Sequence, residues 1–197
     1  QSGTFDVQDG SLEFRRDHTF ETTAAMTGAG TVLFGSGNRE FLSSVSINVG
    51  ALSFAGTNTL ASGCDVVADQ VTFVSGTTTF SGVNYSSGRT TIASAAVNLE
   101  SGSSVALGIT SQSYGTFQLN SGSIATADSL ALSGGTLTGS DELTVNGLFN
   151  WSGGIMRGSG KTSLQGGAAI SSTGTLSLSD SRELVFAAGT ADWTSGA

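Results

Sequence analysis

Two stretches of this sequence decide the fold, because they repeat one another at a fixed distance. Residues 97–103 read VNLESGS and residues 117–123 read FQLNSGS, a shift of 20 positions. A second pair, GGTLTGS at residues 134–140 and GGIMRGS at residues 153–159, repeats after 19 positions. Internal similarity at a period of about 20 residues is typical of solenoids, in which each repeat forms one turn of the chain.

The repeated unit is a pair of apolar residues separated by one residue and commonly followed by glycine. Alternation of this kind places both apolar side chains on one face of a short strand. We predict that the second members of these pairs stack as a core ladder in consecutive coils: Phe14, Phe34, Phe54, Phe73, Leu99, Leu119, Leu132, Trp151, Leu178 and Trp193. Their mean spacing is about 20 residues. The uneven steps of 27 and 13 indicate insertions or a switch of face, and the step of 26 places a candidate inserted loop at residues 82–89.

Composition favours strands over helices. The chain has 29 glycines and no proline in 197 residues. Proline removes a backbone donor, so its absence suits strands that are hydrogen-bonded on both edges. Glycine, serine and threonine, which are abundant here, are poor in helix interiors. We predict an all-β fold, a single parallel β-helix (β-solenoid) of about 20 residues per coil, continuous over residues 1–197.

An antiparallel β-sandwich or barrel is the structural alternative. Its hairpins favour Asn-Gly or Asp-Gly turns, and only Asp9-Gly10 and Asn146-Gly147 offer them. The last unit, residues 181–196, resembles residues 140–153 and stops at its glycine turn. Solenoid ends normally carry an atypical polar cap. No such cap is visible in the last unit, so we expect a segment of a longer repeat protein. Further repeats of the same chain, or self-association, are the partners expected at that end.

The charge, the distribution of apolar residues and the cysteine content argue against nucleic-acid binding, a membrane span and an intrachain disulfide. The net charge is −8 and only seven residues are Lys or Arg, whereas nucleic-acid binding needs clustered cations. No run of about 18 apolar residues is present, so no membrane span is predicted. The single cysteine, Cys64, permits no intrachain disulfide, and we interpret it as a buried free thiol, with an intermolecular bridge as the alternative.

Residues 149–162, FNWSGGIMRGSGKT, resemble the Gly-rich β-strand repeats of large secreted surface proteins, and MTGAGT at residues 26–31 is a shorter example. Such proteins include bacterial autotransporter passengers, filamentous-haemagglutinin-like adhesins and extracellular proteins of some algae and protists. The resemblance is one of spacing and composition over most of the chain. It implies a right-handed coil and an extracellular or cell-surface rod, filament or adhesin, and it carries over no catalytic residue.

Two groups of charged residues come closest to the carboxylate sites of polysaccharide-cleaving enzymes: Asp65 and Asp69 with Arg89, and Asp141 and Glu142 with Arg157 or Lys161. We interpret them as solvated surface charges and predict no catalytic residues. The only histidine, His18, follows Asp17, and we interpret it as structural or exposed. One cysteine and one histidine supply too few ligands for zinc. Neither a metal site nor a cofactor is expected.

Several residues are candidates for contact with glycans. Asn84 and Asn150 begin NYS and NWS, which match the N-glycosylation acceptor pattern, and Asn84 is the better candidate. The middle residues of the apolar pairs point outward and include the amides of Asn98, Gln118 and Asn150, so glycans are a possible partner. These middle residues do not repeat threonine, so binding to ice through an outward threonine ladder is not expected. We interpret Trp151 and Trp193 as core fillers or coil-edge residues in preference to sugar-stacking platforms.

The sequence therefore predicts a structural protein, a component of an extracellular fibre, surface appendage or adhesin stalk. A carbohydrate-binding adhesin is one alternative. A polysaccharide lyase or glycosidase of the β-helix class is the other.

Overall fold

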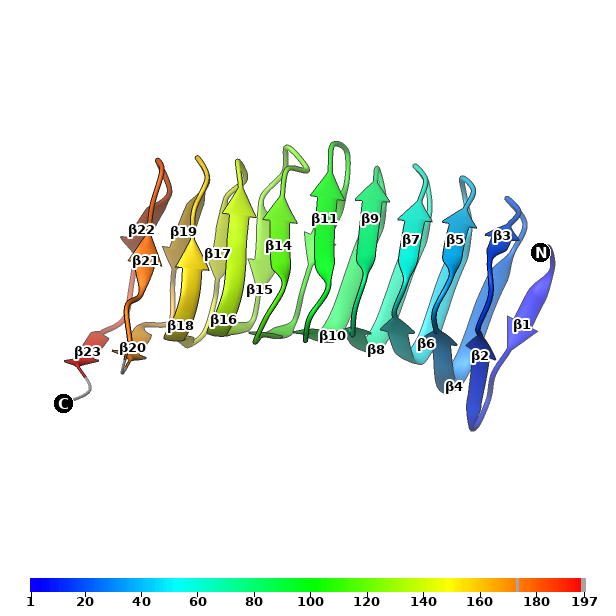
Figure 1. The fold of residues 1–197 in the computed structure, drawn as a ribbon, viewed down its shortest axis with the longest axis horizontal. Helices are drawn as coiled ribbons and strands as arrows, with labels where there is room; N and C mark the ends of the chain where they lie inside the picture. The colour runs from blue at the N-terminus through cyan, green and yellow to red at the C-terminus, as the bar shows by residue number, and fades with distance from the viewer. Residues whose placement is uncertain (173, 196–197) are drawn as a thin grey trace.

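The computed structural model describes residues 1–172 and 174–195, whose strands wind into a parallel β-solenoid of about ten coils (Figure 1). Strands of consecutive coils pair in parallel, as in Thr4↔Ala25 and Phe14↔Phe34. The predicted all-β parallel solenoid with about 20 residues per coil is confirmed, and the antiparallel alternative is wrong. Within the described residues there is no helix, and hence none that could cross a membrane.

Each full coil contributes one strand segment to each of three sheets. Sheet 1 holds β1 (Thr4–Asp6), β12 (Ser104–Ala106), β15 (Ala125–Ala127), β17 (Leu143–Val145), β19 (Lys161–Leu164) and β22 (Glu183–Phe186). Sheet 2 holds β2 (Ser11–Phe14), β13 (Ile109–Gln112), β20 (Ala168–Ser172) and β23 (Ala191–Ser195). Sheet 3 holds β3 (His18–Phe20), β5 (Asn38–Phe41), β7 (Thr57–Leu60), β9 (Thr77–Ser81), β11 (Ala96–Glu100), β14 (Thr116–Leu119) and β21 (Ser177–Leu178).

Six longer strands bend from one sheet into the next. Those passing from sheet 1 to sheet 2 are β4 (Ala25–Phe34), β6 (Ser46–Phe54), β8 (Asp65–Phe73) and β10 (Asn84–Ile92). Those passing from sheet 2 to sheet 3 are β16 (Ser129–Gly139) and β18 (Phe149–Met156). We number the coils from the N-terminus, so that β3, β5, β7, β9, β11 and β14 mark coils 1 to 6 in sheet 3, and the second halves of β16 and β18 mark coils 7 and 8.

The core is a set of columns in which equivalent side chains stack from coil to coil. In sheet 2, Phe14, Phe34, Phe54 and Phe73 pair in register. Their rings stack with centroid separations of 5.6, 5.3 and 5.4 Å. Stacked aromatic pairs of this kind contribute about 0.5–1.5 kcal/mol beyond the area they bury. Identical residues at each turn thus reinforce the register that the backbone ladder sets.

The residues predicted as one core ladder belong to three columns, one in sheet 2 and two in sheet 3. Phe73 continues in sheet 2 through Ile92, Gln112 and Leu132 to Trp151, Ile170 and Trp193. Leu99 and Leu119 pair with each other in sheet 3, whereas Leu178 follows Leu137 and Met156 in the neighbouring column of that sheet. The uneven steps of the sequence pattern are therefore changes of sheet and not insertions. Leu178 and Trp193, in the last coils, are 44% and 72% exposed.

The inserted loop expected at residues 82–89 is absent, because β10 begins at Asn84 and pairs with β8 throughout. Tyr85 and Ser87 point into the core. The hydroxyls of Tyr85 and Ser87 lie 2.9 and 2.6 Å from Oγ1 of Thr90, which donates to the carbonyl of Leu107 at 2.8 Å. The polar composition of this stretch resembles a surface loop in the sequence. Its side chains can nevertheless be buried, because their hydroxyls bond to one another inside the solenoid.

A buried arginine connects the corners of three coils. Arg39 is 2% exposed and points inward from β5. Its guanidinium donates to the carbonyls of Phe14, Ser36, Gly37 and Ala55 at 2.7–3.1 Å. The carbonyls of Phe14 and Gly37 also accept backbone N–H groups of the next coil, so Arg39 adds a second bond to them and supplies a donor at Ser36 and Ala55.

Candidate functional site

Two files of outward side chains run along sheet 3, with one residue of each file in each coil. We call this surface the sheet 3 outer face; Figure 1 shows its strands β5, β7, β9, β11 and β14 side by side. One file contains Asn38, Thr57, Thr77, Ala96, Thr116, Thr136 and Ile155. The other contains Thr19, Glu40, Thr59, Thr79, Asn98, Gln118 and Thr138.

From coil 3 to coil 7 the two files are uncharged and rich in threonine; Glu100, at the end of β11, lies beside them and accepts a hydrogen bond from the hydroxyl of Ser81 at 3.0 Å. Seven of the ten residues of the two files there are Thr, and the others are Ala96, Asn98 and Gln118. The middle residues of the apolar pairs do not reveal these threonines, because those residues lie in two different sheets. The threonines of sheet 3 flank an inward residue, as in Thr57-Asn58-Thr59 and Thr136-Leu137-Thr138. That spacing, recurring at about 20 residues, was the signal available in the sequence.

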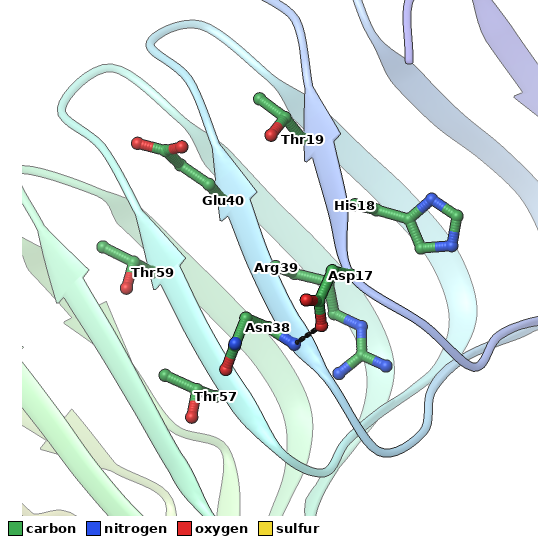
Figure 2. Close-up of a pocket in the computed structure, with 8 residues that line it drawn as sticks. All are labelled: Asp17, His18, Thr19, Asn38, Arg39, Glu40, Thr57 and Thr59. Carbon is green, nitrogen blue, oxygen red and sulfur yellow. Dashed lines mark hydrogen bonds between the residues drawn. The ribbon is translucent and has the colours of Figure 1, made fainter.

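The N-terminal end of the face is a shallow acidic hollow. Figure 2 shows Asp17, Thr19, Asn38, Glu40, Thr57 and Thr59 around it, with His18 and Arg39 behind. Asp17 accepts a hydrogen bond from the backbone N–H of Asn38 at 2.7 Å. Glu40 projects outward and forms no ion pair with any described residue.

Arg39 lies beneath the carboxylates of the hollow. Desolvation by burial lowers the pKa of its guanidinium, and the negative charge of Asp17 acts in the opposite direction. The guanidinium is already engaged by four carbonyls. Glu40 therefore remains free to meet a cation from outside the chain.

The first candidate catalytic group is divided between sheets. Asp65 lies in sheet 1, where it accepts a hydrogen bond from Nδ2 of Asn84 at 2.7 Å. Arg89 lies in sheet 2 beside Gln70, and Asp69 sits at the bend of β8 between them. The three side chains do not share one face.

Asp141 and Glu142 of the second candidate group hold neighbouring coils together. Asp141 is 6% exposed and accepts from the backbone and hydroxyl of Ser121 and from the N–H of Gly122. Glu142 accepts from Ser163 at 2.6 Å and forms an ion pair with Lys161 at 2.9 Å. The hydrogen bond from Ser163 and the contact with Lys161 lower the pKa of Glu142. Arg157, by contrast, lies at the far end of the sheet 3 outer face.

His18 and Cys64 pack within the solenoid. The ring of His18 contacts that of Phe14 edge-on at a centroid separation of 5.1 Å, while Asp17 turns to the backbone of Asn38. Cys64 is 1% exposed, its thiol lies 3.1 Å from the carbonyl of Leu42, and burial raises its pKa. Among the described residues no three His, Cys, Asp or Glu side chains gather as metal ligands.

The candidate glycan contacts fall on different surfaces. Asn98 and Gln118 are neighbours on the sheet 3 outer face, whereas Asn150 lies on the outside of sheet 2. Trp151 is 3% exposed, so its ring is not available to a sugar. Asn84, at the start of β10, is exposed, and its amide bonds to Asp65 and Ser104. Modification at Asn84 or Asn150 stays a prediction.

Comparisons of the chain with protein-family models, with curated proteins and with solved structures find no match. The proposals that follow depend on geometry, on charge and on the resemblance in spacing and composition described above.

Proposed function

We propose that the chain is a structural component of an extracellular fibre, surface appendage or adhesin stalk. The observation that carries this proposal is the unbroken ladder on three sheets. From coil to coil every strand is hydrogen-bonded to its equivalents, as in Ser46↔Asp65↔Asn84, around one aromatic and aliphatic core. An array in which each coil packs on the next has no interdomain hinge and resists bending.

The surface chemistry also supports a structural role. Asp141, Glu142 and Lys161 bond between coils, and Asp65 bonds to Asn84 in the next coil. The extracellular setting follows from the resemblance to Gly-rich repeats of secreted surface proteins. No catalytic activity is part of the proposal, so polysaccharides incubated with the protein should yield no new reducing ends or unsaturated sugars.

Two measurements test the structural proposal. Native protein should resist proteinase K until it is unfolded by denaturant, because its backbone is hydrogen-bonded throughout the coils. Protease treatment of intact cells that produce the protein should release its peptides, as expected for a surface protein. Rapid internal cleavage of the native chain would contradict the stiff rod. Peptides released only after the cells are lysed would contradict the extracellular placement.

A carbohydrate-binding face is the second candidate function. The adjacent amides of Asn98 and Gln118 offer donors and acceptors to sugar hydroxyls. A glycan array probed with the parent and with the double variant Asn98→Ala/Gln118→Ala tests it. The matched control is Thr91→Ala/Ser111→Ala, which changes the same two coils on the outside of sheet 2. Binding lost in both double variants, or in neither, would count against this face.

A further inference from the structure

The sheet 3 outer face is electrostatically self-complementary about its middle. Glu40 projects from coil 2 and Arg157 follows β18 in coil 8, three coils to either side of coil 5. Both occupy the same file, because Met156 pairs with Leu137 and the N–H of Arg157 donates to the carbonyl of Leu137 at 2.9 Å. Neither charge forms an ion pair with a described residue of its own chain. An anion and a cation placed symmetrically about a centre are what an isologous contact requires.

We consider a two-fold axis that runs along the strand direction and passes over coil 5. It turns a second copy so that coil 2 faces coil 8, coil 3 faces coil 7 and coil 4 faces coil 6. Each file then meets its own counterpart. Glu40 of each copy faces Arg157 of the other, which would enter the acidic hollow beside Asp17.

The uncharged residues of the two files suit the same arrangement, while Glu100, beside the files in coil 5, would face Glu100 of the second copy. Asn98 would face Asn98 of the second copy on the axis, where two amides can exchange hydrogen bonds. Thr79 would face Gln118, and Thr59 would face Thr138. Threonine side chains are stiff at χ1, so little freedom is lost when they pack. Two sheet faces can approach to about 10 Å.

The other simple two-fold arrangement is electrostatically worse. An axis parallel to the solenoid would set coil 2 against coil 2 and coil 8 against coil 8. Glu40 would then lie near Glu40 of the second copy, and Arg157 near Arg157. Because like charges across an interface oppose association, these two pairs cost more than the single Glu100 pair of the antiparallel arrangement, which also gains two Glu40–Arg157 contacts.

We infer that two copies of this chain pair laterally through the sheet 3 outer face, with antiparallel solenoid axes and reciprocal Glu40–Arg157 contacts. The inference deepens the structural role proposed above by naming the partner and the surface. From coil 2 to coil 8 the contact is about 29 Å long, at about 4.8 Å per coil. One sheet of that length is at the small end of specific interfaces, so the dimer should form reversibly with concentration.

Sedimentation equilibrium over a hundredfold concentration range tests the pairing. The parent protein should move from monomer to dimer. Glu40→Arg and Arg157→Glu should each weaken dimerisation by about tenfold or more, because both reciprocal contacts then join like charges. Arg89→Glu, an exposed reversal on sheet 2, should leave it unchanged. A parent that stays monomeric, or a dimer that neither reversal weakens, would overturn the inference.

Mixing the two charge-reversed variants gives the sharper result. In a mixed dimer each contact again joins an acidic to a basic side chain, so equal amounts of Glu40→Arg and Arg157→Glu should associate as tightly as the parent. Circular dichroism of each variant shows beforehand that it is folded. A folded pair that fails to associate would overturn the arrangement, while protease resistance of the monomer would still support the rod.

Cross-linking locates the two-fold axis. In a Cys64→Ala background, Asn98→Cys places one thiol per copy at coil 5 of the face. A short bis-maleimide should join two copies of this variant. Thr91→Cys, in the same coil but on sheet 2, should give no dimer. Equal cross-linking of the two variants would overturn the assignment of the face.

Discussion

At the scale of single residues, the buried hydroxyls of coil 5 are the least expected feature of the interior. Tyr85 is 3% exposed, and its hydroxyl lies within hydrogen-bond distance of those of Ser87 and Thr90. Burial raises the pKa of Tyr85 to about 12, and the two hydroxyl contacts offset only part of that effect. The phenol is therefore neutral wherever the protein is folded at ordinary pH.

This shift predicts a pH-dependent loss of stability that belongs to Tyr85. The unfolded phenol loses its proton near pH 10, whereas the folded one keeps it to about pH 12. Between these values the folded state binds more protons, so the free energy of unfolding falls as pH rises, by at most about 2–3 kcal/mol. Urea unfolding at about pH 9 and about pH 11.5 should show a smaller loss for Tyr85→Phe than for the parent. Equal losses would contradict a buried, protonated phenol.

The same residues show where sequence reasoning reaches its limit. Asn84-Tyr85-Ser86-Ser87-Gly88 has the composition of a surface loop, because serine and tyrosine are as compatible with water as with one another. Their inward direction depends on Thr90 and on the carbonyl of Leu107, which lies in the next coil. No local sequence pattern indicates a hydrogen-bond partner in the next coil. Arg39 is similar, since its four acceptors come from three coils.

At the scale of elements, the corners between sheets 2 and 3 depend on glycine. Gly56 and Gly76 occupy this corner in consecutive coils with φ of +73° and +75°. A Cβ atom on Gly76 would collide with the carbonyl oxygen of Gly56 in the coil below. Both the backbone conformation and the approach of neighbouring coils therefore exclude a side chain there.

Alanine substitutions at two glycines separate the cost of the strained backbone conformation from the cost of crowding between coils. Gly122 has φ of +77°, but no atom lies within 4 Å of the Cβ that it lacks. Gly122→Ala should lower the free energy of unfolding by about 1–2 kcal/mol through backbone strain alone. Gly76→Ala should cost several kcal/mol more, because the coils must also move apart. Urea denaturation followed by circular dichroism measures both, and equal losses would show that crowding at the corner is unimportant.

Strands, coil length and parallel stacking could be predicted because they follow from alternation and period, which are local. The assignment of each strand to one of three sheets could not, since an apolar pair looks the same in all of them. Leu99 was aligned with Phe73 for this reason. The true successor, Ile92, follows Thr90 instead of an apolar residue, and Gln112 replaces an apolar residue in the next coil. Because the strands could not be assigned to sheets, the sheet 3 outer face could not be predicted either.

At the scale of the whole molecule, substitutions should be energetically coupled only when they lie in the same coil or in adjacent coils. Each coil packs only on the coils before and after it, as in other solenoids. The stacked phenylalanines make this testable. Phe54 and Phe73 lie in adjacent coils with ring centroids 5.4 Å apart and planes 8° apart. Phe149 points into the core of coil 8, four coils beyond Phe73.

Double-mutant cycles should therefore give different coupling energies for near and distant pairs. Phe54→Leu and Phe73→Leu each remove the stacked pair, so their combined loss should be smaller than the sum of the single losses by about 0.5–1.5 kcal/mol. Phe54→Leu and Phe149→Leu share no contact, and their losses should add to within about 0.5 kcal/mol. The free energies of unfolding in urea supply both cycles. Comparable coupling in the two cycles would mean that the coils respond as one globular core, and the one-dimensional account of the solenoid would then be wrong.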